Sequence, residues 1–211
     1  MADDSTEIAD LLHRAGDGES EAISDLFSRF RGRLKRMVRL RLNRRLYGRV
    51  DDSDVLQEAY LEAARRLPEY LQEPVLPFFL WLRHITGQQL LVVHRRHLGT
   101  RMRDAAREVS LHRGGLPAAS SASLAAQLLG RLTSPSQAAV KAERRLRLQE
   151  ALNTMDEFDR EVLTLRHFEQ LSNSEVATTL GIQESAASKR YVRALDRLQQ
   201  TLSELGLFNE R

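Results

Sequence analysis

The stretch LSNSEVATTLGIQESAASKRYVRALDRL, Leu171 to Leu198, decides the fold of the C-terminal part of the chain. Ser172 and Glu175 have the spacing of a capping box, so a short helix is expected to begin here. Gly181 follows that helix at a point where a sharp turn needs a positive φ angle. A second helix is then expected, and two helices joined by a tight turn indicate a helix-turn-helix.

The second helix of this motif has one face for packing and one for contacts with a ligand. Four residues share the packing face at helical spacing: Ala187, Tyr191, Ala194 and Leu198. The opposite face carries polar and basic side chains of the kind that contact base edges and phosphates. The candidate DNA-binding residues are Ser185, Ser188, Lys189, Arg190 and Arg193. An ordinary helical hairpin is the alternative, but the cap, the glycine and the facing residues all agree with a helix-turn-helix.

The longer segment from Leu148 to Leu202 resembles the promoter-binding domain of bacterial sigma factors of the extracytoplasmic-function class. The residues that carry the resemblance are Arg160, Glu161, Val162, Leu165, Glu175, Ala177, Leu180, Gly181, Arg190 and Ala194. The resemblance implies that this domain reads the minus-thirty-five promoter element. Gln183, Ala187 and Ser188 depart from the residues that the family commonly has, so the preferred base sequence stays open.

A helix with an acidic face is expected in the N-terminal half, over DDSDVLQEAYLEAARRL, Asp51 to Leu67. It resembles the sigma-factor helix that docks on the clamp of RNA polymerase. The resemblance implies that the polymerase-binding residues are Asp51, Asp54, Gln57, Glu58 and Leu61. Asp54 and Glu58 are like charges one turn apart, an arrangement that a basic partner surface would relieve.

A purely local role for the start of this helix is the alternative interpretation. Asp52 or Ser53 would cap the helix, and Asp54 would complement its dipole. That interpretation explains the start of the helix but leaves Gln57 and Glu58 unexplained.

The segment FFLWLRHITGQQLLVVHRRHLGTRMRD, Phe78 to Asp104, is similar to the family's promoter-melting and minus-ten-reading segment. The resemblance implies that it contacts DNA through Arg83, Gln88, Arg95 and Arg96, and that the preceding loop, 68–76, holds a flipped base. Gln88 and Val92 depart from the Asn and Asp that are common there. Trp81 either packs in the core or stacks on a base, and its apolar neighbours favour the core.

Basic residues gather in two stretches, although the net charge is only +3. Ten Arg or Lys residues and no acidic residue lie between Arg29 and Arg49, and a second stretch runs from His94 to Arg107. Such stripes are typical of a polyanion-binding surface, with a solvated helix face as the alternative. His94 and His97 could hold a metal, but Arg95 and Arg96 between them would repel a cation, so a nucleic-acid surface is favoured.

Helical spacing of apolar residues throughout predicts an all-α fold of two helical domains joined by a flexible linker, the second containing the helix-turn-helix. The expected domains are 1–109 and 137–211, and the Gly, Ala, Ser and Pro-rich segment 110–136 is the expected linker, with a transient helix over 123–132. Helices are expected over about 6–15, from 20, from after Ser53 to just before Pro68, from 78 to near 107, and over 137–155. Pro68 to Pro77 is expected to be a loop.

Other functional classes lack support in the sequence. There is no cysteine, no apolar run of membrane-spanning length, no signal sequence and no catalytic motif, so we expect a cytoplasmic protein that is not an enzyme and needs no cofactor or metal. The resemblance implies promoter DNA and core RNA polymerase, through its clamp and flap, as partners of a monomer. An anti-sigma factor is a further candidate partner. The rival functions are an autonomous helix-turn-helix regulator and, on charge alone, a general RNA-binding or architectural protein.

Overall fold

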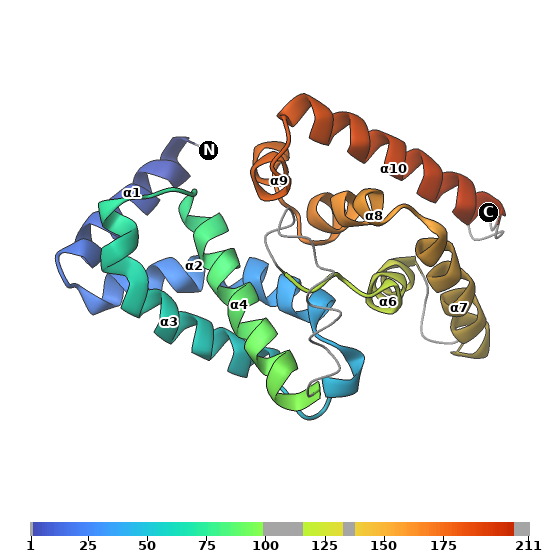
Figure 1. Ribbon diagram of the computed structural model, residues 1–211, viewed down its shortest axis with the longest axis horizontal. Coiled ribbons are helices and arrows are strands. Elements are labelled where there is room, and N and C mark those ends of the chain that lie inside the picture. The colour runs from blue at the N-terminus through green and yellow to red at the C-terminus, as the bar shows by residue number, and fades with distance from the viewer. Residues whose placement is uncertain (1, 99–115, 133–137, 205–211) are drawn as a thin grey trace. The chain divides into compact units, whose positions relative to one another are not determined.

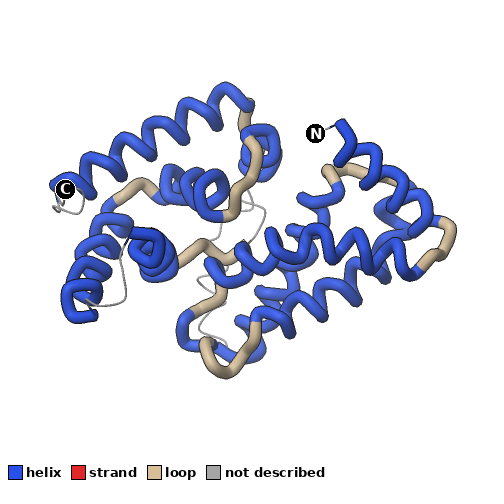
Figure 2. Tube along the Cα trace, turned by 180° about the vertical axis from the view of Figure 1, so that it is seen from behind, coloured by secondary structure: helices blue, strands red, loops and turns tan. Residues whose placement is uncertain are grey.

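The computed structural model describes residues 2–98, 116–132 and 138–204, and it divides the chain into two units (Figure 1). The first comprises Met1–Val38 and Arg44–Glu108, and the second comprises Arg39–Asn43 and Val109–Arg211. Helices and loops, but no strands, make up the described residues (Figure 2). The expected all-α class, with a helix-turn-helix near the C-terminus, is confirmed.

The first unit is built on three long helices that share one core. Its elements are α1 (Ala2–Gly16), α2 (Ser20–Arg41), the 3₁₀ turn η1 (Arg44–Leu46), α3 (Asp52–Gln72) and α4 (Phe78–Leu98). Helix α3 packs along α4, and the apolar stripe of α2 is buried at Leu26, Phe27, Phe30, Leu34 and Val38, as its spacing predicts. The second basic stretch lies outside the described residues beyond Leu98, so the expected extension of this helix to about 107 is not described.

Helix α3 does not stop before Pro68, contrary to the sequence-based expectation. It continues through the proline to Gln72, because buried Leu67 and Tyr70 keep the last turns against the core. The hydroxyl of Tyr70 also donates a hydrogen bond of 2.9 Å to the carbonyl oxygen of Leu76. Packing here outweighs the lost backbone bond that proline imposes inside a helix, and the loop shortens to 73–77.

Aromatic side chains join the end of α3 to the start of α4. Trp81 lies against Tyr70, with ring centroids 4.6 Å apart, and against Phe78 at 5.5 Å. Phe30 of α2 reaches Phe78 at 6.0 Å. Trp81 is only half-buried, but its partners are aromatic side chains of the protein itself, which supports the structural role favoured from the sequence.

The second unit is a helical domain with one apolar core. Its elements are α6 (Ser121–Leu132), α7 (Ala138–Thr154), α8 (Glu157–Leu163), the π turn η3 (Thr164–Phe168), α9 (Asn173–Leu180) and α10 (Glu184–Glu204). Every one of these except α9 contributes to the core, whose largest members are Leu124, Leu148, Leu152, Leu163, Phe168, Leu198 and Leu202. Helix α7 begins and ends within one residue of the expected 137–155.

Part of the expected linker is folded. Within 110–136 the structure describes 116–132, and there α6 packs along α7 with Leu124, Leu128 and Leu129 buried. The helix expected over 123–132 is present as α6, which begins two residues earlier, and it is packed on the domain. The composition is rich in small residues, but the three leucines form an apolar stripe that the domain core accepts.

Residues Arg39–Asn43, which include the last residues of α2, belong to this second unit. Within this segment the charged side chain of Arg41 is buried. Its guanidinium donates to Glu161 at 2.5 Å, to Glu169 at 2.7 Å and to the carbonyl oxygen of Pro117 at 2.8 Å. Burial alone would lower the pKa of Arg41, but the two carboxylates raise it, so the guanidinium stays charged. A buried charge that is paired in this way is costly to lose.

None of the described helices is long and apolar enough to cross a membrane. Nor does the described part of the chain gather three or more metal-ligating side chains into one group.

The expectation that His94 belongs to a nucleic-acid surface is wrong, because its side chain is only 2% exposed. Burial lowers the pKa of His94 from 6.5 to about 4. The imidazole is therefore neutral at pH 7 and packs inside the first unit, while Arg95, Arg96 and His97 lie exposed beside it.

We expect acid to destabilise the first unit through His94. Between pH 6.5 and about 4 the unfolded chain binds a proton on this imidazole that the folded unit excludes, so stability falls as pH falls through that window. Denaturant unfolding followed by the fluorescence of Trp81, the single tryptophan, checks this at pH 7 and pH 5. His94→Leu should lose less stability on acidification than the wild type, and an equal loss in both would contradict the prediction.

Candidate polymerase- and DNA-binding surfaces

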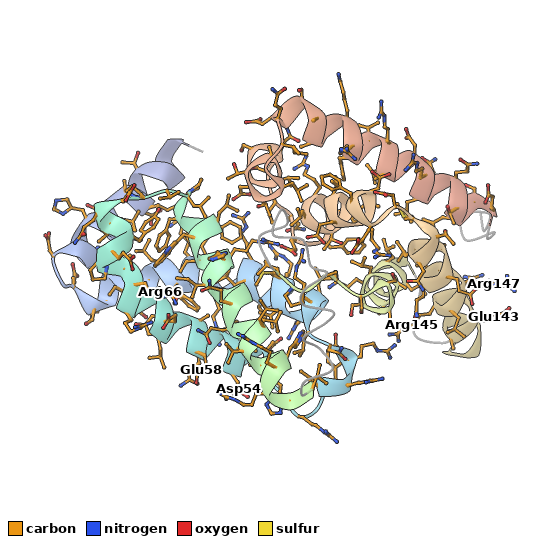
Figure 3. All side chains as sticks on the ribbon, in the orientation of Figure 1. Asp54, Glu58, Arg66, Glu143, Arg145 and Arg147 are labelled. Carbon is orange, nitrogen blue, oxygen red and sulfur yellow. The ribbon has the colours of Figure 1, made fainter. Side chains whose placement is uncertain are left out.

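The five residues expected to bind polymerase lie on one exposed face of α3. They are Asp51, Asp54, Gln57, Glu58 and Leu61, and the side chain of Leu61 is 56% exposed although it is apolar. Figure 3 shows Asp54 and Glu58 pointing away from the neighbouring helices. Val55, Leu56, Ala59 and Ala63 form the buried side. The helix thus combines a packing stripe with an acidic, partly apolar surface.

Asp51, and not Asp52 or Ser53, caps this helix. Its side chain accepts a 2.9 Å hydrogen bond from the amide of Ser53, and Asp54 returns a 3.4 Å contact to the amide of Asp51. Asp52 instead pairs with Lys35 of α2 at 3.3 Å. Local capping therefore accounts for Asp51 and part of the role of Asp54, but Gln57 and Glu58 have no part in it.

Arg83, expected to contact DNA in the minus-ten segment, is buried. Only 4% of this residue is exposed, because it lies on the inward face of α4 between Leu82 and Ile85. The prediction that Arg83 contacts DNA is therefore wrong, because the residue lies in the interior of the first unit. The prediction was based on the positive charge of the side chain, whereas burial depends on which face of the helix the residue occupies.

Gln88 is half-buried and is held by its neighbours. Its Oε1 accepts a 3.3 Å hydrogen bond from Arg66 of α3, and its Nε2 lies 2.9 Å from Nε2 of His84. Arg66 is itself paired with Glu62 at 2.5 Å. Of the four residues expected to read the minus-ten element, Arg95 and Arg96 are the fully exposed ones.

The long basic stretch on α2 is partly used inside the fold. Lys35 pairs with Asp52, Arg41 is buried, and the guanidinium of Arg33 lies 3.5 Å from the ring centroid of Phe79. Arg31, Arg44 and Arg49 are exposed. The stretch is therefore only in part a solvent-facing cationic surface.

The helix-turn-helix has the local geometry that the sequence predicts. The hydroxyl of Ser172 accepts from the amide of Glu175 at 3.1 Å, and Glu175 accepts from the amide of Ser172 at 2.7 Å, which completes the capping box. Gly181 has φ 64°, a left-handed conformation that favours glycine. The side-chain amide of Asn173 donates to the carbonyl oxygen of Glu184 at 2.9 Å and so ties the two helices together.

All five candidate DNA-binding residues of α10 are exposed: Ser185, Ser188, Lys189, Arg190 and Arg193. Ala187, Ala194 and Leu198 are buried on the opposite side and fix the helix to the domain. The candidate reading face is thus presented to solvent by a rigid support, as a helix in the major groove requires.

Arg190 differs from the other four residues because it packs against its own domain. Its guanidinium lies 4.4 Å from the ring centroid of Phe158 and 4.0 Å from the carboxylate of Asp159. Asp159 is nearly buried and also pairs with Arg197. These contacts position α10 on α8, a role that the sequence alone did not reveal.

Val192 is an exposed residue of α10 that the sequence analysis missed. It is 53% exposed and lies between Lys189 and Arg193 on an otherwise polar surface. Its position at i+3 from Lys189 could have found it, because that spacing puts both on one face. An apolar side chain there can contact a thymine methyl group.

Comparison with known proteins agrees with this geometry. Residues 145–198 match the family described as sigma-70, region 4. The structure of CnrH in complex with the cytosolic domain of CnrY is similar in fold, with 20% identity, a TM-score of 0.53, and coverage of 92% of this chain and 96% of that chain. The sigma factor RpoE, in complex with the anti-sigma factor NepR from Bartonella quintana, matches with 18% identity and a TM-score of 0.45 over 85% and 97% of the two chains. No curated protein matches the chain.

The helix-turn-helix of the second unit is therefore a sigma-70 region 4 domain. The likeness of the whole chain to CnrH is a likeness of fold.

Proposed function

We propose that this protein is a sigma factor of the extracytoplasmic-function class that directs transcription initiation. It docks on the polymerase clamp through α3 and reads the minus-thirty-five element through α10. The observation that carries the proposal is the exposed face of α10, where Ser185, Lys189 and Arg193 project from a domain that matches region 4. On the first unit, the exposed carboxylates of Asp54 and Glu58 form an acidic surface that is complementary to a basic partner.

The minus-ten element is the proposed target of the first unit. Arg95 and Arg96 remain the exposed basic residues at the end of α4, and the loop 73–77 precedes that helix. Phosphate contacts from such arginines position the DNA, and a base taken out of the stack would add to the energy available for strand opening. Gln88 would first have to leave its contacts with Arg66 and His84.

Further partners and the cellular compartment follow from the same proposal. The second unit would contact the polymerase flap, and an anti-sigma factor would be a further partner. The protein would act as a monomer on the polymerase, in the cytoplasm.

An autonomous helix-turn-helix regulator is the second candidate, and the self-contained geometry of α9 and α10 is the observation that favours it. Transcription with purified core polymerase on a library of promoter fragments separates the two. The sigma proposal expects specific initiation that depends on the protein and weak binding to duplex DNA by the free chain. Tight duplex binding without initiation or binding to the core enzyme would instead establish the regulator.

Removing two cations from α10 is expected to weaken promoter binding and its dependence on salt. If Lys189 and Arg193 each contact a phosphate, Lys189→Ala/Arg193→Ala lowers the slope of log affinity against log salt by about 2. Arg190→Ala is the matched control, because Arg190 packs on Phe158 and Asp159. The control should change this slope less, and equal slopes for the double variant and the wild type would exclude the two phosphate contacts.

A further inference from the structure

Helix α6 is the largest feature of the second unit that the proposed function does not use. It lies outside the residues 145–198 that match region 4, yet it packs along α7 and belongs to the core of the domain. Leu124, Leu128 and Leu129 are at most 8% exposed. A region 4 domain is thus covered by a helix from outside its matched boundaries.

The apolar core that α6 joins is formed by residues of several helices, and α7 is the helix along which α6 packs. Leu148 and Leu152 come from α7, Leu163 and Phe168 from α8 and η3, and Leu202 from α10. All five are at most 5% exposed while α6 is in place. This surface is separate from the candidate reading face, because α10 turns Leu198 and Leu202 inward and Lys189 and Arg193 outward.

The segment that covers this surface is suited to leaving it. An isolated helix of 12 residues is marginal in water, so α6 depends on the domain for its helical state. Half of its residues are Ser, Ala or Gly, which bury little apolar area. Its polar contacts include a long hydrogen bond of 3.4 Å from Arg145 to the carbonyl oxygen of Ala122, and a cap from Ser120 within the same segment.

We propose that α6 is a displaceable cover, and that the surface beneath it binds an amphipathic helix of a protein partner. Helix α6 itself shows what such a partner helix should carry: three leucines at positions i, i+4 and i+5 on one side. A partner with this stripe competes with α6 for the same core residues. The inference rests on the proposed sigma function only for the step in which displacement accompanies assembly with polymerase.

The first experiment supplies α6 in trans. A fluorescently labelled peptide of residues 116–132 is titrated into full-length wild type and into full-length Leu124→Asp/Leu128→Asp, whose own helix cannot stay on the apolar surface. The peptide should bind the variant about tenfold or more tightly than the wild type, where the tethered α6 competes. A peptide with the same two substitutions is the control and should bind neither protein. Equal binding of the native peptide to both proteins, or none to the variant, overturns the proposal.

The second experiment locks α6 in its place on the domain. The chain has no cysteine, so Ala122→Cys/Arg145→Cys carries the only two thiols, at positions already joined by the Arg145 hydrogen bond. Figure 3 places Arg145 toward α6 and Glu143 and Arg147 on the other side of α7. A short, reductant-cleavable cross-linker across 122 and 145 ties α6 down. The same reagent across Glu143→Cys/Arg147→Cys bridges one turn of α7 alone and is the matched control.

Initiation with core polymerase is the readout of the locked protein. Locking should lower initiation about tenfold or more by removing the open state, and reductant should restore it, while the control pair is unaffected. Full initiation by the locked protein overturns the proposal and makes α6 a permanent part of the domain. Absence of initiation before any cross-linking contradicts the sigma function instead, and the peptide titration then decides by itself whether the apolar surface accepts a second helix.

Discussion

Asp54→Arg/Glu58→Arg is expected to abolish promoter-specific initiation and to weaken binding to core polymerase by about 100-fold. The reason is that both carboxylates are exposed on one face of α3, and a basic partner surface would meet two arginines in their place. Juxtaposed like charges across an interface cost several kcal/mol, and each 1.4 kcal/mol is about tenfold in affinity. Binding of the labelled protein to purified core enzyme, followed by initiation on a promoter fragment, measures both effects.

The matched control for this variant is Glu21→Arg/Asp25→Arg. These two acids are also exposed, also one turn apart and also near the start of a helix, so the change in net charge and the effect on the helix dipole are alike. The control should bind and initiate like the wild type. Equal losses in both variants would mean that net charge, and not the face of α3, controls assembly.

Salt adds a second test of the same surface. If the docking contact is electrostatic, wild-type binding to the core enzyme weakens as ionic strength rises, whereas the residual binding of the charge-reversed variant changes less. Leu61 lies on the same face and is apolar, so part of the affinity should persist in high salt.

Short-range signals explain why much of the helix-turn-helix could be predicted from the sequence. Ser172 and Glu175 satisfy backbone amides within a few residues, and Gly181 meets a local need for a positive φ angle. Such features depend on neighbours in the chain and not on tertiary packing. The same holds for the exposed face of α3, which follows from helical spacing alone.

The errors arose where tertiary packing outweighs local chemistry. Arg83 and His94 are polar residues of α4, which has buried residues on more than one side, so helical spacing could not tell which of its polar residues lie inside. Pro68 has the local chemistry of a helix stop, yet burial of Leu67 and Tyr70 carries α3 past it. The helix over 123–132 was expected, but its packing in the core of the second unit was not, because a composition rich in small residues is typical of a linker.

The partners of Arg41 could not be predicted for a related reason. Glu161 and Glu169 lie 120 and 128 residues away in sequence, and nothing in the local pattern of α2 distinguishes this arginine from its exposed neighbours. Asp159 is a similar case, because its role in holding Arg190 and Arg197 exists only once α8 and α10 are packed together. Long-range ion pairs of this kind leave no periodic signal in the sequence.

Phe168→Ala is expected to destabilise the second unit by about 3–5 kcal/mol, the usual cost of removing a buried phenylalanine. Phe168 is 1% exposed and ends the π turn η3, and it belongs to the apolar core to which α6, α7, α8 and α10 contribute. Since folded domains have only about 5–15 kcal/mol of stability, much of the unit's reserve would be lost. Promoter recognition should then fail even though every residue of the candidate reading face is unchanged.

Hydrogen exchange of the amides in α8, α9 and α10 measures this loss directly, because the slowest of them exchange through global opening of the unit. In Phe168→Ala their exchange should be faster by about the factor that 3–5 kcal/mol implies, which is more than 100-fold. Leu146→Ala removes a leucine of the same unit that is 61% exposed and should cost less than about 0.5 kcal/mol. If the two variants exchanged alike, Phe168 would not be central to the core, and the support that holds the reading face of α10 would have to come from elsewhere in the domain.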